Sequence, residues 1–205
     1  MRLAALCIAA GAALGCVSVD SGASGIAHAE ADSDFESYHL RRVGLVPFAG
    51  QTLDREHARV LQAAFLHEFA INTDFEIVML EDGAMEEVVE SHPYRRGRLK
   101  PLTVLELSKR YSLDGILMGT VTHVNAYPPQ VLGVEMDLIA CETGLPIWSS
   151  RIQMDASDVR VRNGLTEYAR KQERTGAPRG DSLALISPTR FARYAAYEVA
   201  QTLPQ

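Results

Sequence analysis

Apolar and polar residues alternate most clearly between residues 111 and 151, and this pattern predicts three consecutive β-strands. The run Gly115-Ile-Leu-Met-Gly is apolar at almost every position, which is typical of a strand covered on both faces. From Thr120 the chain alternates polar and apolar residues, which indicates that one face becomes wet. Residues 132–140 and 146–154 continue the pattern on either side of a turn at residues 142–144. We therefore expect an antiparallel three-stranded meander at the centre of the fold.

Helical spacing appears on both sides of this meander. Leu61, Phe65 and Phe69 recur every four residues and predict a helix over residues 53–71, with Asp54 suited to its first turn. Ser187 followed by a proline predicts the start of a last helix, which extends to about residue 203. Three further helices are expected over residues 83–90, 103–111 and 156–174. Thr103 is the predicted cap of the 103–111 helix, with Glu106 completing a capping box.

Two further strands are expected before the meander, near residues 43–46 and 75–81. Helices separate the first strand from the second and the second from the meander, so these strands should be parallel neighbours joined by right-handed crossovers. The predicted fold class is α/β. It consists of a mixed five-stranded sheet, made of two βα crossovers followed by the antiparallel meander, with helices packed on it. Residues 40–205 should form this single domain.

The first 16 residues have the pattern of a bacterial secretory signal. A short basic start precedes an apolar run over residues 3–14, which is too short to span a bilayer comfortably. The run ends at Ala-Leu-Gly-Cys16, which resembles the lipobox of bacterial lipoproteins, in which the cysteine is lipidated and becomes the first residue of the mature chain. Val17, rather than aspartate, follows Cys16, and this favours the outer membrane. A rival site for ordinary cleavage lies after Ala29, in the sequence Ala-His-Ala.

Residues 17–39 are rich in Ser, Gly, Ala, Asp and Glu, and we expect them to form a flexible tether. The whole chain carries a formal net charge of -6, which argues against binding to nucleic acid. Its hydrophobic content of 47% is enough for one globular core.

No set of residues in the sequence has the spacing of a catalytic or metal site. His67-Glu68 lacks the second histidine of a zinc-binding helix, and no glycine-rich loop has the pattern that holds phosphates. Cys141 lies outside any hydrolase motif and suits a half-buried position, while Trp148 suits the core. We therefore expect no metal, no cofactor and no catalytic residue, and we do not expect an enzyme.

The most suggestive polar feature is a basic loop in an acidic protein. Its candidate partner-binding residues are Tyr94, Arg95, Arg96, Arg98 and Lys100. Such a loop could contact an acidic protein, an anionic lipid or a cell-wall polymer, although a merely solvated loop would have the same composition. Residues 158–180 add a second charged segment outside the core pattern and are a second candidate contact surface.

Three phrases resemble a family of bacterial envelope lipoproteins that includes the curli-secretion lipoprotein CsgG, the penicillin-binding-protein activator LpoB and the N-terminal domain of TolB. They are Arg42-Val-Gly-Leu-Val-Pro-Phe, Leu113-Asp-Gly-Ile-Leu-Met-Gly-Thr-Val and Glu142-Thr-Gly-Leu-Pro-Ile-Trp-Ser. The resemblance covers residues 41–154 and the last helix. It implies a non-enzymatic protein that binds or assembles with other envelope proteins. The chain departs from the family in residues 158–186 and lacks the long alternating insertions expected of the curli channel.

These observations lead us to expect a lipid-anchored envelope protein that faces the periplasm from the outer membrane and binds a protein partner. A homo-oligomeric subunit of a secretion or envelope complex is one alternative. A soluble periplasmic or secreted protein, cleaved after Ala29 and acting as a small-ligand-binding protein or hydrolase, is the other.

Overall fold

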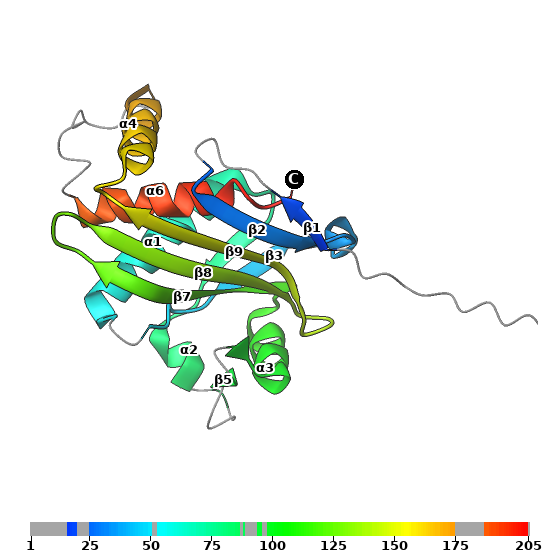
Figure 1. Ribbon diagram of the computed structural model, residues 1–205. Coiled ribbons are helices and arrows are strands. Elements are labelled where there is room, and N and C mark those ends of the chain that lie inside the picture. The colour runs from blue at the N-terminus through cyan, green and yellow to red at the C-terminus, as the bar shows by residue number, and fades with distance from the viewer. Residues whose placement is uncertain are drawn as a thin grey trace, which may run out of the picture.

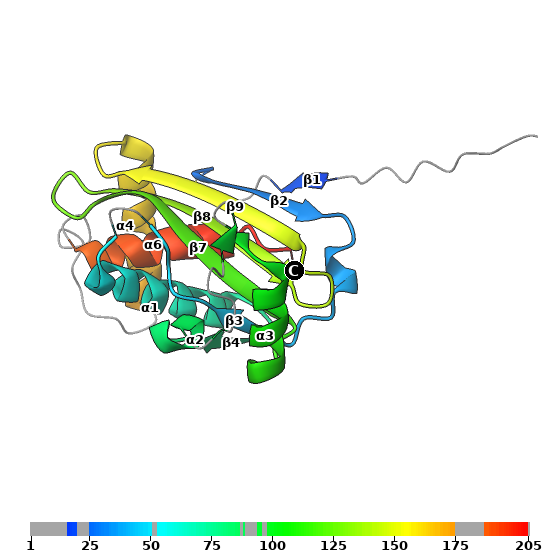
Figure 2. The same ribbon diagram turned by 90° about the horizontal axis from the view of Figure 1, so that it is seen from below.

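A mixed α/β fold is present in the computed structural model, which describes residues 16–19, 25–50, 53–86, 88, 94–95, 98–174 and 187–204. Its main sheet has seven strands in the order β1-β2-β9-β8-β7-β3-β4. Helices α1 (Arg55–Asn72) and α6 (Pro188–Ala200) cover one face of the sheet. Helices α2 (Asp82–Glu86) and α3 (Pro101–Tyr111) cover part of the other face (Figures 1 and 2).

The predicted meander is confirmed as three long strands. These are β7 (Gly115–Asn125), β8 (Val131–Ala140) and β9 (Pro146–Asp155), and both pairs are antiparallel. Alternate side chains of β8, among them Leu132, Val134 and Met136, are buried on the α1–α6 face, as the alternation of the sequence predicted.

The order of the parallel strands differs from the prediction. Strand β3 (Arg42–Leu45) pairs in parallel with both β4 (Glu76–Met79) and β7, so β4 and β7 are not neighbours. Val43 and Leu45 of β3 are fully buried, whereas both end residues of β4 are exposed. The more apolar strand therefore takes the inner position and β4 forms an edge of the sheet.

The predicted count of five strands was wrong because two more strands precede them. Strand β1 (Cys16–Val19) pairs with β2 (Ala27–Asp32), and β2 pairs with β9. A 3₁₀ turn, η1 (Phe35–Ser37), follows. Residues 17–19 and 27–32 of the predicted tether therefore belong to the sheet. Ala27, Ala29 and Ala31 are buried in the core shared with α6, where alanine side chains fill the space that composition alone assigned to a solvated segment.

The predicted cap at Ser187 is confirmed, because its hydroxyl accepts a hydrogen bond from the Arg190 backbone N–H (3.4 Å). Helix α1 begins at Arg55 rather than at the predicted residue 53, and Asp54 is its cap residue, which accepts a hydrogen bond from the His57 backbone N–H (2.8 Å). Helix α3 instead starts at Pro101, with Lys100 as its cap residue, so Thr103 lies buried inside the helix. Proline has the backbone geometry of a first helical turn and begins the helix two residues early.

Candidate membrane anchor and interaction surfaces

The candidate lipidation site, Cys16, is the first residue of the sheet. Its Cα lies opposite that of Asp32 in the antiparallel pair β1–β2. The rival cleavage site after Ala29 lies in the middle of β2, where Ala29 is paired with Ser150 of β9. The two processing sites therefore have different consequences, because cleavage after Ala29 would remove β1 and half of β2 from the fold.

The basic loop begins as a small β-hairpin that precedes α3. Strands β5 (Tyr94–Arg95) and β6 (Arg98–Leu99) pair with each other, and the Leu99 side chain of β6 is buried. The exposed Arg98 guanidinium lies 3.9 Å from the Asp137 carboxylate of β8. The side chains of Tyr94 and Arg95, and Arg96 as a whole, lie outside the described residues. Among the predicted contact residues, the structure places Arg98 next to Asp137, on the face of the sheet opposite α1 and α6. Lys100 lies at the start of α3.

The outer face of β2, β9 and β8, opposite α1 and α6, is polar. Glu135 of β8 pairs directly with Arg151 of β9, and His28 of β2 pairs with Arg151 from the other side. The Ser149 hydroxyl donates a hydrogen bond to the Asp137 carboxylate (2.5 Å). This face carries both signs of charge on a rigid surface, and β-sheet backbone holds its side chains at fixed spacing. Sequence alternation in β8 indicated such a face but not that β2 extends it.

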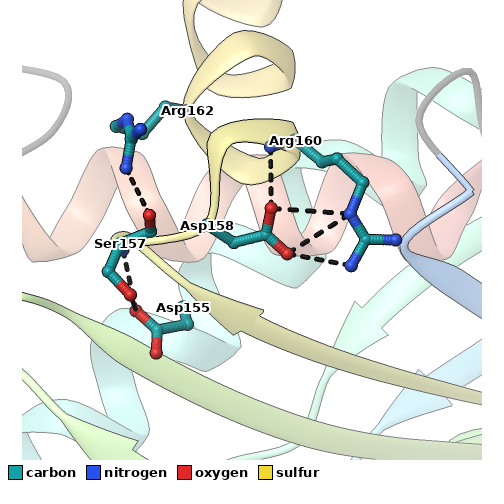
Figure 3. Close-up of polar contacts among 5 residues, drawn as sticks. All are labelled: Asp155, Ser157, Asp158, Arg160 and Arg162. Atoms are coloured by element: carbon teal, nitrogen blue, oxygen red, sulfur yellow. Dashed lines mark hydrogen bonds and ion pairs between the residues drawn. The ribbon is translucent and has the colours of Figure 1, made fainter.

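The 158–180 segment begins as helix α4 (Val159–Arg174), and its first charges serve to start the helix. The Asp158 carboxylate accepts hydrogen bonds from the Arg160 backbone N–H (2.8 Å) and from its guanidinium (2.8 Å to Nη2), as Figure 3 shows. Asp155 accepts bonds from the backbone N–H and hydroxyl of Ser157, and Arg162 donates to the Ser157 carbonyl. These hydrogen bonds lower the pKa of both Asp155 and Asp158. This part of the predicted contact surface therefore has a local structural role.

Further along α4, two buried contacts hold the helix against the core. The Tyr168 hydroxyl donates a hydrogen bond to the fully buried Glu68 carboxyl group of α1 (2.5 Å). Gly164 faces Tyr194 of α6, and a Cβ at Gly164 would lie only 1.9 Å from the Tyr194 hydroxyl oxygen. Gly164 is thus the residue that lets α4 approach α6. Glu68 and Tyr168 are 100 positions apart, so their pairing left no signal in the sequence.

Burial is the largest influence on the pKa values of Glu68 and Tyr168. It raises the pKa of Glu68, and the Tyr168 hydrogen bond, His67 and Arg193 oppose it only in part. Burial and the neighbouring carboxylate also raise the pKa of Tyr168. The second oxygen of Glu68, Oε2, has no hydrogen-bond partner among the described residues. Glu68 therefore takes up its proton at a higher pH than an exposed glutamate does.

One surface pocket brings together the residue types that a hydrolase would need. It has a volume of about 450 Å³ and is lined in part by His39, Ser108, Asp114 and Cys141. However, Asp114 accepts hydrogen bonds from two backbone N–H groups, of Arg41 and Arg42, and the Ser108 hydroxyl donates to the Leu113 carbonyl. Burial raises the pKa of the Cys141 thiol to about 11, which keeps it protonated. Asp114 and Ser108 therefore hold the backbone, and the protonated Cys141 is not an activated nucleophile.

A larger open pocket of about 570 Å³ lies between η1, the end of α1 and the C-terminal residues. It is lined by both polar and apolar residues, including Phe35, Tyr38, Ile71 and Asp74. Within the described parts of the chain, no three His, Cys, Asp or Glu residues are grouped to hold a metal ion. No helix in those parts is long and apolar enough to cross a bilayer.

No protein-family model matches the chain, and no curated protein matches it. Among solved structures, it is similar to the PelC dodecamer from Paraburkholderia phytofirmans, with a TM-score of 0.43 and 12% identity over 76% of this chain and 86% of that one. The lipoprotein GNA1162 from Neisseria meningitidis gives a TM-score of 0.43 and 14% identity over 67% of this chain and 99% of that one. The C-terminal domain of LpoB from Escherichia coli gives 0.40 and 18% over 55% and 81%. At these values the likeness does not extend to individual residues of the surfaces described above.

Proposed function

We propose that this chain is a lipid-anchored protein of the bacterial cell envelope whose folded domain binds other envelope proteins and has no catalytic role. The observation that carries the proposal is the position of Cys16. Processing there leaves the whole seven-stranded sheet in the mature chain, because β1 begins at that residue. Processing after Ala29 would leave a sheet without β1 and with only the second half of β2.

Loss of the first half of β2 would open the core. Ala27 is fully buried and Ala29 is nearly so, and both pair with β9 next to the buried Trp148 region. Removal of these residues would expose apolar surface of β9 and α6 and leave backbone groups of β9 without partners. A mature domain that starts at Cys16 avoids both costs, which supports the lipobox over the rival site.

Protein binding, rather than catalysis, suits the surfaces of the domain. The outer face of β2, β9 and β8 has charged side chains at regular spacing, and Arg98 extends this face at the hairpin. Arg residues on a rigid surface can form bidentate contacts with acidic partners. We propose Tyr94, Arg95, Arg96, Arg98 and Lys100 together with this outer face as the contact surface. The residue after Cys16 is Val17, which supports placement in the outer membrane facing the periplasm.

Fractionation of a bacterial host that expresses the full chain tests the proposal. The Cys16→Ala variant should leave the membrane fraction, whereas Cys7→Ala, in the same apolar leader, should behave as the wild type. Membrane association that survives Cys16→Ala would contradict the anchor. Crosslinking from a photoreactive group at Arg98 then tests the second half of the proposal, which predicts adducts with an envelope protein that depend on the native domain.

A subunit of an oligomeric envelope complex is a second candidate, and the free edge of the sheet favours it. Among the described residues, β4 pairs with β3 alone, and its Met79 side chain is exposed. An unpaired edge can join the edge of another chain. Light scattering of the purified protein should then give a mass above that of one chain, and Met79→Arg should reduce it. A single-chain mass at high concentration would exclude this candidate.

A further inference from the structure

Three large apolar side chains are exposed together at one end of the molecule. Leu102 and Leu105 of α3 are 62% and 44% exposed, and Leu145, in the turn between β8 and β9, is 61% exposed. The turn touches the start of α3, because a Cβ at Gly144 would lie 3.9 Å from Cβ of Pro101. We call these three leucines the apolar end patch.

Helix α3 is apolar on two opposite sides, which is unusual for a helix that only borders water. Val104 and Leu107 point inward and are buried in the core of the outer sheet face. Leu102 and Leu105 lie three residues apart and share the outward side. An outward apolar pair on a surface helix marks a place where another apolar phase is contacted.

The patch lies at the same end of the sheet as Cys16. Cys16 pairs with Asp32, and the preceding residue of β2, Ala31, pairs with Trp148 near the start of β9. Two strand spacings, about 10 Å, separate β1 from β9, whose first residue follows Leu145. In both ribbon views β1, the β8–β9 turn and α3 lie towards one end of the sheet, while α4 lies at the other (Figures 1 and 2).

We propose that the apolar end patch rests on the surface of the phospholipid bilayer that holds the Cys16 lipid. This inference depends on the lipid anchor proposed above. Because no residue separates Cys16 from the sheet, the anchor holds this end of the domain within reach of the headgroups. The leucines would enter the interfacial region, and the exposed Lys109, one turn beyond Leu105, would reach lipid phosphates. Glu142, which lies in the β8–β9 turn with Leu145, is also exposed. Apolar contact rather than net charge therefore provides the attraction.

This orientation has a consequence for partner binding. The end that carries α4 and the β7–β8 turn would point away from the membrane. The polar outer face of the sheet would then be perpendicular to the bilayer surface. The α4 end and the polar outer face of β2, β9 and β8 would both be accessible to proteins in the compartment that the domain faces.

Site-specific fluorescence on the acylated full-length protein tests this orientation. The protein is placed in vesicles of phosphatidylethanolamine and phosphatidylglycerol that contain a lipid-borne quencher, on a Cys141→Ala background that removes the half-buried free thiol. One sample carries an environment-sensitive label at Leu145→Cys. The control carries it at Val159→Cys, which is exposed to a similar degree, 57%, at the opposite end. We expect quenching to be several-fold stronger at position 145 than at position 159.

The outcomes separate this inference from the anchor. Equal, weak quenching at both positions in a protein that is acylated and vesicle-bound would overturn the orientation. Absence of acylation would overturn both proposals. As a second variant, Leu102→Ser with Leu105→Ser should reduce the difference between the two labels while acylation and vesicle recovery stay unchanged. If that difference persists at full size, the patch does not contact the bilayer.

Discussion

Adjacent residues of β8 show how different the two faces of the sheet are. Met136 is buried beneath α1 and α6 with 1% of its surface exposed, while its neighbour Glu135 points to the open face and is exposed. Apolar burial is the main source of folding free energy, so the covered face holds the fold together. The part of the other face that α2 and α3 leave uncovered can change its side chains at little cost to stability, which leaves it available for recognition.

The largest difference between the faces should appear in unfolding experiments on these two residues. Met136→Ala should destabilise the domain by about 2–5 kcal/mol, because it removes buried atoms and leaves a cavity. Glu135→Ala should change the free energy of unfolding by no more than about 0.5 kcal/mol. Urea unfolding followed by circular dichroism measures both. Equal losses in the two variants would mean that the outer face is also packed.

A second comparison concerns the effect on stability of replacing each of two helical glycines by alanine. Gly164→Ala should destabilise α4 packing by about 1–3 kcal/mol, because the new methyl group would collide with Tyr194. Gly83→Ala, in α2, meets no atom within 4 Å and should be neutral or stabilise by up to about 1 kcal/mol through helix propensity. Thermal unfolding and proteolysis within α4 report the difference. Similar effects at both sites would argue against close contact between α4 and α6.

The buried Glu68 predicts how stability depends on pH. Its pKa in the folded state lies above the ordinary value of 4.5, so the folded protein binds the proton more tightly than the unfolded chain. The contribution of Glu68 to stability is therefore fully present below pH 4.5 and declines as the pH rises through the folded-state pKa. Glu68→Gln keeps an acceptor for Tyr168 but cannot ionise, and it should flatten this decline.

Chemical unfolding of the wild type and Glu68→Gln across this range provides the measurement. Glu135→Gln is the matched control, since its carboxylate is exposed. If the wild type and Glu68→Gln have parallel pH profiles, Glu68 does not titrate with folding.

A small effect on stability is also expected at the hairpin. Arg98 and Asp137 form an exposed pair at 3.9 Å, so Arg98→Ala should change the free energy of unfolding by less than about 1 kcal/mol. Its effect should instead appear as weaker crosslinking to the partner from a photoreactive group placed at Lys100. Arg59→Ala, at an exposed position of α1, serves as a charge-matched control for that assay. Loss of partner binding only with loss of folding would contradict a direct contact.

Local sequence patterns predicted the elements that depend on local physics. The period-two alternation of the meander, the four-residue repeat of Leu61 and Phe65, and the cap at Ser187 are each decided within a few residues. The structure agrees with the sequence at all of these positions.

Features that depend on distant partners were missed. The alternation of Ala27, Ala29 and Ala31 with polar residues was visible, but alanine is a weak strand signal and gains its role only beneath α6. The inner position of β3 depends on the competition between β3 and β4 for neighbours. The Glu68–Tyr168 contact joins residues 100 positions apart. The apolar end patch joins a helix to a hairpin turn, and only the folded chain brings them together.

The mass of the mature chain, extracted from the membranes of a bacterial host, tests the account most directly. We predict a protein that begins at Cys16 and carries additional mass from its lipid, which chemical cleavage of the acyl chains reduces. A mature chain that begins at Glu30 without lipid would contradict the anchor, the completeness of the seven-stranded sheet in the mature protein, and the orientation inferred from both.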